Sequence, residues 1–163
     1  MSYESALSVY RDVLPHAYGI LPGHMRSDAA DVMLLAIGLQ ESGLEERVQR
    51  GGGPAHGLWQ FEQGGAIPGI LRLNSTRRHA RGVCSACGVS ADSGSVWSAL
   101  ATDDVLAACF ARLLLWSDPF PIPSPGDQDG GWAYYEKLWR PGKPHPERWP
   151  GNHEIARRIV GIQ

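Results

Sequence analysis

The segment at residues 103–116, DDVLAACFARLLLW, is the sequence feature that most constrains the fold. Its two leading aspartates favour the start of a helix, because negative charge is stabilised at the positive end of the helix dipole. The rest of the segment is apolar on almost every side, which is typical of a helix that is buried over most of its surface. We therefore expect this helix to form the centre of the core.

The remainder of the chain has the pattern of short helices separated by glycine and proline, with little of the alternation that marks strands. A second apolar helix is expected to begin at an N-cap, Ser27 or Asp28, and to close at Gly43, a natural C-cap. With 163 residues, we expect a single, mainly α domain spanning residues 1–163. Further helices are expected at 3–14, 65–73, 75–88, 130–139 and 152–160, with loops after Pro15 and at 118–131, and with a loop or at most a small irregular hairpin at 45–65.

Charge and hydropathy argue against several classes of function. The 15 Lys and Arg nearly balance the 17 Asp and Glu, giving a net charge of −2, so a nucleic-acid partner is not expected. The basic run RRHAR at residues 77–81 is an exception, and such clusters are usually solvated faces. The N-terminus does not resemble a signal peptide, so we expect synthesis in the cytoplasm. The apolar runs are too short and too interrupted for stable membrane insertion.

The three cysteines leave a zinc or redox module as an alternative. Cys84 and Cys87 form a CxxC motif, but no second CxxC or HxxxH lies at a spacing typical of zinc fingers. A structural zinc site would need distant ligands such as His79 and Cys109. The sequence also lacks an alternating βαβ pattern. We expect reduced thiols on a helix, or a local disulfide in an oxidising compartment, and no metal or other cofactor.

Glu41 is the candidate catalytic residue. Met33, Ile37 and Glu41 follow one another at a spacing of four, so the carboxylate continues a helical stripe that faces the core. Burial and the negative end of the helix dipole both favour its protonated form. A carboxyl group that stays protonated near neutral pH is suited to general acid catalysis. The alternative is that Glu41 projects past the end of the helix into water.

Two aromatic segments are candidates for the walls of a carbohydrate-binding cleft. In GPAHGLWQFE, a glycine-flanked turn is expected to present Trp59, Gln60 and Phe61. Aromatic faces stack on sugar rings, and amides hydrogen-bond to the hydroxyl groups. In GWAYYEKLW, Tyr134 or Tyr135 would place a hydroxyl group near the same cleft.

The order of these motifs resembles the lysozyme-like superfamily, which includes the goose-type lysozymes and the soluble lytic transglycosylases. The resemblance is carried by ESG at a helix end, then GLWQ after a loop, then the apolar helix at 103–116 and the aromatic segment WAYYEKLW. It implies a mainly α, lysozyme-like α+β fold with a substrate cleft. The family's Ala-Tyr-Asn-Ala-Gly-like motif is absent, and GGWAYYEKLW is a divergent substitute. The missing signal peptide and the tail WRPGKPHPERWP resemble phage-encoded members in particular.

The resemblance also implies roles for individual residues. It assigns the general acid to Glu41 and a neighbour that orients the acid or the substrate to Ser42. Glu62 has no counterpart in the family and is the candidate for a second carboxylate. The other implied substrate-binding residues are the turn that floors the cleft, Gly57, Leu58, Trp59 and Gln60, and the tyrosines Tyr134 and Tyr135.

The implied activity is cleavage of the β-1,4 bond between N-acetylmuramic acid and N-acetylglucosamine in peptidoglycan. A hydrolase normally needs two acidic groups. A lytic transglycosylase needs one, because the same glutamate then takes the proton of the muramic acid's own 6-hydroxyl group and a 1,6-anhydro ring closes. The acids that follow Glu41 are Glu45, Glu46 and Glu62, and none lies in an Asp-containing turn of the kind that lysozymes use to hold a second acidic group. This favours the transglycosylase. The alternatives are a water-using muramidase with Glu62 as second carboxylate, and a non-catalytic, cell-wall-binding virion protein. We expect a monomer that reaches the wall by holin-dependent release, at lysis or within a virion.

Overall fold

The computed structural model describes residues 2–162, and most of these residues are helical. The described residues include no β-strand, and the loop between α3 and α4 contains only isolated antiparallel bridges, from His56 to Val48 and to Phe61. In chain order the elements are α1 (Ser2–Asp12), α2 (Leu14–Ile20), the 3-10 turn η1 (Gly23–Met25), α3 (Asp28–Ser42), α4 (Ala66–Arg72), α5 (Arg77–Cys87), α6 (Ser93–Leu100), α7 (Asp104–Trp116), α8 (Gln128–Trp139), the 3-10 turn η2 (Pro146–Arg148) and α9 (Trp149–Val160).

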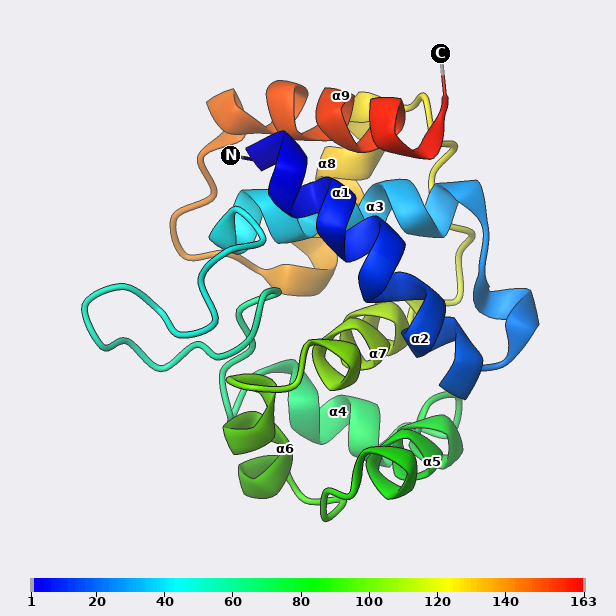
Figure 1. The fold of residues 1–163 in the computed structure, drawn as a ribbon, viewed down its shortest axis with the longest axis vertical. Helices are drawn as coiled ribbons and strands as arrows, with labels where there is room; N and C mark the ends of the chain where they lie inside the picture. The colour runs from blue at the N-terminus through cyan, green and yellow to red at the C-terminus, as the bar shows by residue number, and fades with distance from the viewer. Residues whose placement is uncertain (1, 163) are drawn as a thin grey trace.

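Helix α7 lies at the centre of the core, as the sequence predicts. Every residue from Leu106 to Leu115 is buried, and α2, α4, α5 and α6 all pack against this helix. Figure 1 shows these four helices gathered around α7 in the lower part of the molecule. Asp103 caps the helix, because its carboxylate accepts a hydrogen bond of 3.0 Å from the backbone N–H of Leu106. The predicted helix and its acidic start are therefore confirmed.

Helix α3 is the second buried helix, and its last turn carries Glu41. Its residues from Ala30 to Leu39 are buried, with α9 packed along it and α1 across it (Figure 1). The predicted caps are confirmed. The Ser27 hydroxyl accepts a hydrogen bond of 3.0 Å from the backbone N–H of Ala30, and Gly43 ends the helix at a φ of 69°.

Three elements differ from the sequence-based expectation. The loop expected after Pro15 is the helix α2, since proline in the first turn of a helix has no N–H to lose from the hydrogen-bonding ladder. Helix α6 has no counterpart among the predicted helices, although Asp92 provides its N-cap. Helix α8 begins at Gln128, inside the segment expected to be a loop, because Asp127 caps it. Glycine and proline content led us to expect loops in these segments. In each case a residue that favours the start of a helix, either a proline in its first turn or an aspartate N-cap, decided the structure instead.

The cysteines are free thiols in two adjacent helices. Cys84 and Cys87 lie on α5, and Cys109 lies on α7. Burial raises the pKa of the Cys87 thiol to about 11, which disfavours the reactive thiolate. Among residues 2–162, no group of three or more His, Cys, Asp or Glu side chains is placed to hold a metal ion.

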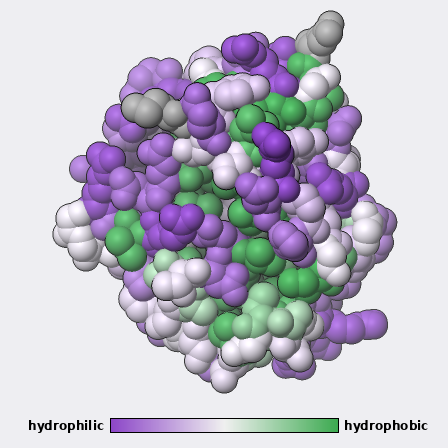
Figure 2. Space-filling model, in the orientation of Figure 1, coloured by the Kyte–Doolittle hydropathy of each residue, from purple (hydrophilic) through white to green (hydrophobic). Residues whose placement is uncertain are grey.

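Hydrophilic side chains cover most of the face shown in Figure 2, with apolar side chains visible only in small groups between them. The basic run RRHAR forms the start of α5, where Arg77, Arg78 and Arg81 are exposed. Within the described part of the chain, none of the helices has the length and apolar character needed to cross a bilayer.

Candidate active site

A groove of about 1130 Å³ lies at the C-terminal end of α3. It is lined by the last turn of α3, the loop that follows, the end of α8 and the segment 140–148. Five of the residues expected in the site line this one groove, although they come from three separate parts of the sequence: Glu41, Ser42, Gln60, Glu62 and Tyr135.

Glu41 has the environment that its position in the sequence predicts. Its side chain is half-buried in the wall of the groove rather than projecting freely into water. Burial raises the pKa of the Glu41 carboxyl to about 7, because the charged form loses solvation. A hydrogen bond donated by the Tyr135 hydroxyl to Glu41 Oε2 opposes this rise. The protonated form of the Glu41 carboxyl therefore persists to much higher pH than it does for an ordinary glutamate.

Tyr135, and not Tyr134, is the tyrosine that faces the groove. Both lie on α8, but the Tyr134 hydroxyl is buried and donates a hydrogen bond of 3.0 Å to the carbonyl of Leu115. The Tyr135 ring stacks on Trp149 of α9, with centroids 5.4 Å apart and an interplanar angle of 9°. Since Tyr135 is only 1% exposed and its ring is packed in this way, its hydroxyl is held in place against Glu41.

Ser42 connects the end of α3 to the turn at residues 57–60. Its hydroxyl donates a hydrogen bond of 2.5 Å to the carbonyl of Leu58 and accepts one of 3.1 Å from the backbone N–H of Leu44. The hydroxyl proton of Ser42 is thus already used in a hydrogen bond to the protein backbone. Ser42 therefore positions the turn relative to Glu41 instead of offering a donor to the acid.

The turn needs glycine at position 57. Gly57 has a φ of 83°, a conformation that other residues rarely adopt, and a Cβ atom here would lie 3.1 Å from the backbone oxygen of Leu100. Gln60 follows at a φ of 55°, and its side-chain amide donates a hydrogen bond of 2.9 Å to the Gly57 carbonyl. The turn is therefore rigid, and it leaves the Gln60 side chain at the groove.

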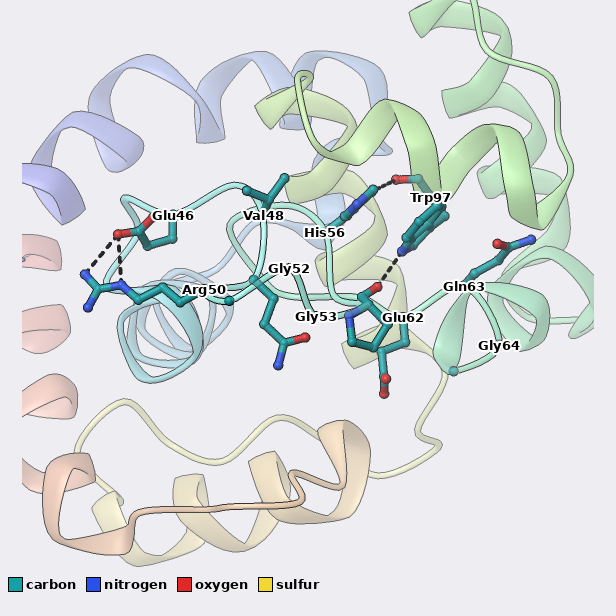
Figure 3. A pocket seen from close by; sticks show the side chains of 14 residues that line it. Glu46, Val48, Arg50, Gly52, Gly53, His56, Glu62, Gln63, Gly64 and Trp97 are labelled. Atoms are coloured by element: carbon teal, nitrogen blue, oxygen red, sulfur yellow. Dashed lines mark hydrogen bonds and ion pairs between the residues drawn. The ribbon is translucent and has the colours of Figure 1, made fainter.

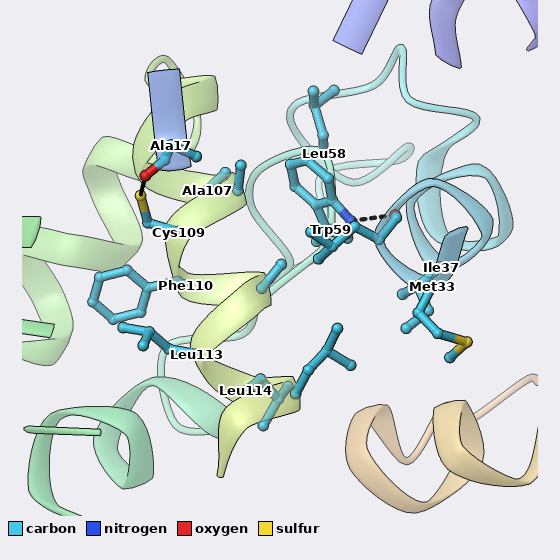
Figure 4. Close-up of a cluster of buried hydrophobic side chains, with 14 of the residues drawn as sticks. Ala17, Met33, Ile37, Leu58, Trp59, Ala107, Cys109, Phe110, Leu113 and Leu114 are labelled. Carbon is cyan, nitrogen blue, oxygen red and sulfur yellow. Dashed lines mark hydrogen bonds between the residues drawn. The ribbon is translucent and has the colours of Figure 1, made fainter. Parts of the chain in front are cut away.

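Trp59 is not presented to the groove, so the expectation that its ring stacks on a sugar is wrong. The ring is fully buried, and its Nε1 donates a hydrogen bond of 2.8 Å to the carbonyl of Leu34, as Figure 4 shows. Leu58 is also fully buried, and Phe61 is 3% exposed. A glycine-flanked turn was expected to expose its aromatic residues, but these apolar side chains are stabilised more by packing against α3 and α7 than by facing water.

Glu62 is an exposed carboxylate on the border of the groove. It is thus on the same surface feature as Glu41, as expected for a second carboxylate. Its side chain has no hydrogen-bond partner among residues 2–162.

The structure adds groove residues to which the sequence does not point. Trp139 at the end of α8 lines the groove and donates a hydrogen bond of 3.0 Å from Nε1 to the carbonyl of Trp59. Gln40 donates hydrogen bonds of 2.8 and 3.0 Å to the carbonyls of Pro144 and His145, and accepts one of 2.9 Å from Asn152. Gln40 therefore ties the segment 140–148 to α3 directly beside Glu41. No local pattern reveals this contact, because its partners lie more than a hundred residues away.

Taken together, these residues form an open groove with a half-buried carboxyl group, an aromatic edge and amide groups. Comparison with known proteins adds no relative: no protein-family model matches the chain, and no curated protein and no solved structure matches it either.

Proposed function

We propose that the protein cleaves the β-1,4 bond between N-acetylmuramic acid and N-acetylglucosamine in peptidoglycan, as a lytic transglycosylase with a lysozyme-like fold. The observation that carries this proposal is the half-buried Glu41 carboxyl, with its pKa raised to about 7, in the wall of a groove large enough for several sugar rings. A general acid is most effective when its pKa lies near the working pH.

In this proposal Glu41 acts twice. The protonated carboxyl first donates its proton to the glycosidic oxygen, and the bond from that oxygen to C1 of the muramic acid breaks. The Glu41 carboxylate then accepts the proton of the muramic acid's 6-hydroxyl group, whose oxygen bonds to C1 and closes the 1,6-anhydro ring. Glu41 regains its proton, and no water enters the products. The Tyr135 hydrogen bond supports the carboxylate between the two steps.

A water-using muramidase is the second candidate, because Glu62 lines the same groove as Glu41. In that reaction one carboxyl group protonates the leaving oxygen, and the other activates water or attacks the sugar. The product would then carry a free reducing end and would be heavier than the anhydro product by one water molecule. The two reactions are therefore distinguishable by mass alone.

Digestion of purified sacculi, with mass spectrometry of the released muropeptides, tests the proposal. The wild-type protein should release muropeptides with anhydro ends, and Glu41→Gln should release none, because an amide has no carboxyl proton to donate. Glu154→Gln is the matched control, since it removes an exposed carboxylate on α9 that does not line the groove.

Each outcome leads to a clear decision. Release of products with a free reducing end would replace the transglycosylase by the muramidase. Full activity of Glu41→Gln would remove Glu41 from the mechanism. A wild-type protein that sediments with sacculi but releases nothing would be a wall-binding protein.

A further inference from the structure

A second hollow, of about 1040 Å³, adjoins the groove on the side of the loop between α3 and α4. Figure 3 shows the Glu46–Arg50 ion pair at one end of it, Trp97 at the other and Glu62 between them. The residues that line both the hollow and the groove are Glu46, Gln49, Arg50, Pro54 and Glu62. The hollow and the groove therefore adjoin each other along a shared border.

Trp97 of α6 supplies a rigid aromatic surface to this hollow. Its ring stacks on the His56 imidazole, with centroids 3.8 Å apart and an interplanar angle of 7°. The Trp97 Nε1 donates a hydrogen bond of 2.8 Å to the carbonyl of Pro54. In addition, the His56 Nδ1 lies 2.9 Å from the Trp97 carbonyl oxygen, and both interactions are drawn in Figure 3. The indole is thus fixed in place before any ligand binds, while part of it stays accessible.

Polar groups near this ring are free to bind a ligand. The side chains of Glu62 and Gln63 are exposed and line the hollow, and neither has a hydrogen-bond partner within residues 2–162. A fixed aromatic plane beside a free carboxylate and a free amide is the combination that binds a pyranose ring, since the plane packs against the C–H face and the polar groups bond to hydroxyl or acetamido groups.

We propose that this hollow is a distal sugar-binding subsite, in which Trp97 packs against a ring of a glycan strand whose cleavage point lies at Glu41. The subsite rests on the proposed function, because it continues the same groove. It assigns to Trp97 the stacking role that the sequence suggests for Trp59. The ligand class is an N-acetylhexosamine ring several residues away from the scissile bond, so only long glycans reach it.

Binding of oligosaccharides by the Glu41→Gln protein tests this subsite without any turnover. The probes are a disaccharide and a hexasaccharide of β-1,4-linked N-acetylglucosamine, titrated by calorimetry. Adding Trp97→Ala should weaken binding of the hexasaccharide about tenfold, as expected for the loss of roughly 1.4 kcal/mol of stacking. Binding of the disaccharide should not change. Trp97→Phe retains a ring and should lose less affinity than Trp97→Ala.

Trp116→Ala is the matched control. Trp116 is also partly exposed and also contacts a histidine, His24, but it lines neither the hollow nor the groove. This variant should bind both sugars as the parent does. Thermal unfolding of each variant separates a loss of affinity from a loss of folded protein.

An unchanged affinity of Trp97→Ala for the hexasaccharide would overturn the subsite, as would an equal loss for both sugars. These failures are distinct from failure of the proposed function. A wild-type protein that releases anhydro-muropeptides, together with a length-independent effect of Trp97, would keep the enzyme and remove the subsite. Length-dependent binding through Trp97 in a protein that releases nothing from sacculi would leave the subsite and remove the enzyme.

Discussion

The Tyr135 hydroxyl donates a hydrogen bond to Glu41 Oε2, although the two residues lie 94 positions apart in the sequence. The bond stabilises the charged form of the carboxyl, whereas burial stabilises the neutral form. Burial is the stronger of the two effects, so the pKa remains raised, at about 7. The balance between these two effects determines the pH at which Glu41 can both donate and accept a proton.

Tyr135→Phe should move the pH dependence of activity upward. Without the hydrogen bond the carboxylate is less stable, so the pKa of Glu41 rises further and the acid stays protonated to higher pH. The descending limb of kcat/KM against pH, which reports the free enzyme's acid, should shift upward by up to about one unit. Tyr134→Phe is the control, because that hydroxyl bonds to the Leu115 carbonyl and not to Glu41. A limb that stays in place or moves downward in Tyr135→Phe contradicts the prediction.

Glu41→Gln should stabilise the folded protein at alkaline pH. The pKa of Glu41 is raised from 4.5 to about 7 in the folded state, so between these values the folded protein holds a proton that the unfolded chain releases. Folding stability therefore falls as pH rises through this window. Glutamine stays neutral and avoids this loss, which amounts to at most about 3.5 kcal/mol above neutral pH, at roughly 1.4 kcal/mol per pKa unit.

Urea unfolding of both proteins at about pH 4 and about pH 8 measures this difference. The two curves should agree at the lower pH more closely than at the higher one, where Glu41→Gln should have the higher midpoint. Exposed Glu154, replaced by glutamine, should show no such divergence. Equal midpoints of the wild type and Glu41→Gln at both pH values would mean that burial does not raise the pKa.

The two buried helices could be predicted from sequence because their information is local. The aspartate at position 103, the serine at 27 and the glycine at 43 each act within one helical turn, and the apolar residues between them have no alternative to burial. The same local pattern identified Glu41, since it extends the apolar stripe of α3 to the helix end. Local patterns therefore yielded the helix, its ends and the acid on it.

The rest of the site depends on which distant segments meet. The sequence could not decide between Tyr134 and Tyr135, because adjacent helical residues differ only in direction, and packing against Trp149 sets that direction. The exposure of Trp59 was predicted wrongly for a similar reason. Its indole has a buried carbonyl acceptor on α3, which is visible only once the helix and the turn are placed together.

Ser42→Ala should reduce activity more than its loss of stability explains. The substitution removes the hydrogen bond to the Leu58 carbonyl and should cost about 1–2 kcal/mol of folding free energy. It also frees the turn that carries Gln60 from the helix that carries Glu41, so kcat should fall. Thr76→Val is the control, because it removes a buried bond of 2.6 Å to the Ile70 carbonyl away from the groove. Comparable melting temperatures with kcat reduced only in Ser42→Ala are expected, and equal kcat values would contradict the positioning role.

Gln40→Leu should loosen the segment 140–148 without changing the acid. The leucine has a similar size but cannot donate to the carbonyls of Pro144 and His145, and it leaves Asn152 without its acceptor. The segment forms part of the groove wall, so KM should rise, by about tenfold if one net hydrogen bond of roughly 1.4 kcal/mol is lost. The pH at which activity declines should not move, because the Tyr135 bond to Glu41 is untouched.

Hydrogen exchange of Gln40→Leu, followed by mass spectrometry, should show faster exchange in the segment 140–148 and unchanged exchange in α7. Asn152→Ala removes only the contact that orients the Gln40 amide, so it should produce the same changes to a smaller extent. If exchange in the segment were unchanged in Gln40→Leu, its attachment would have to depend on the docking of α9 on α3 instead, and the rise in KM would then be absent as well.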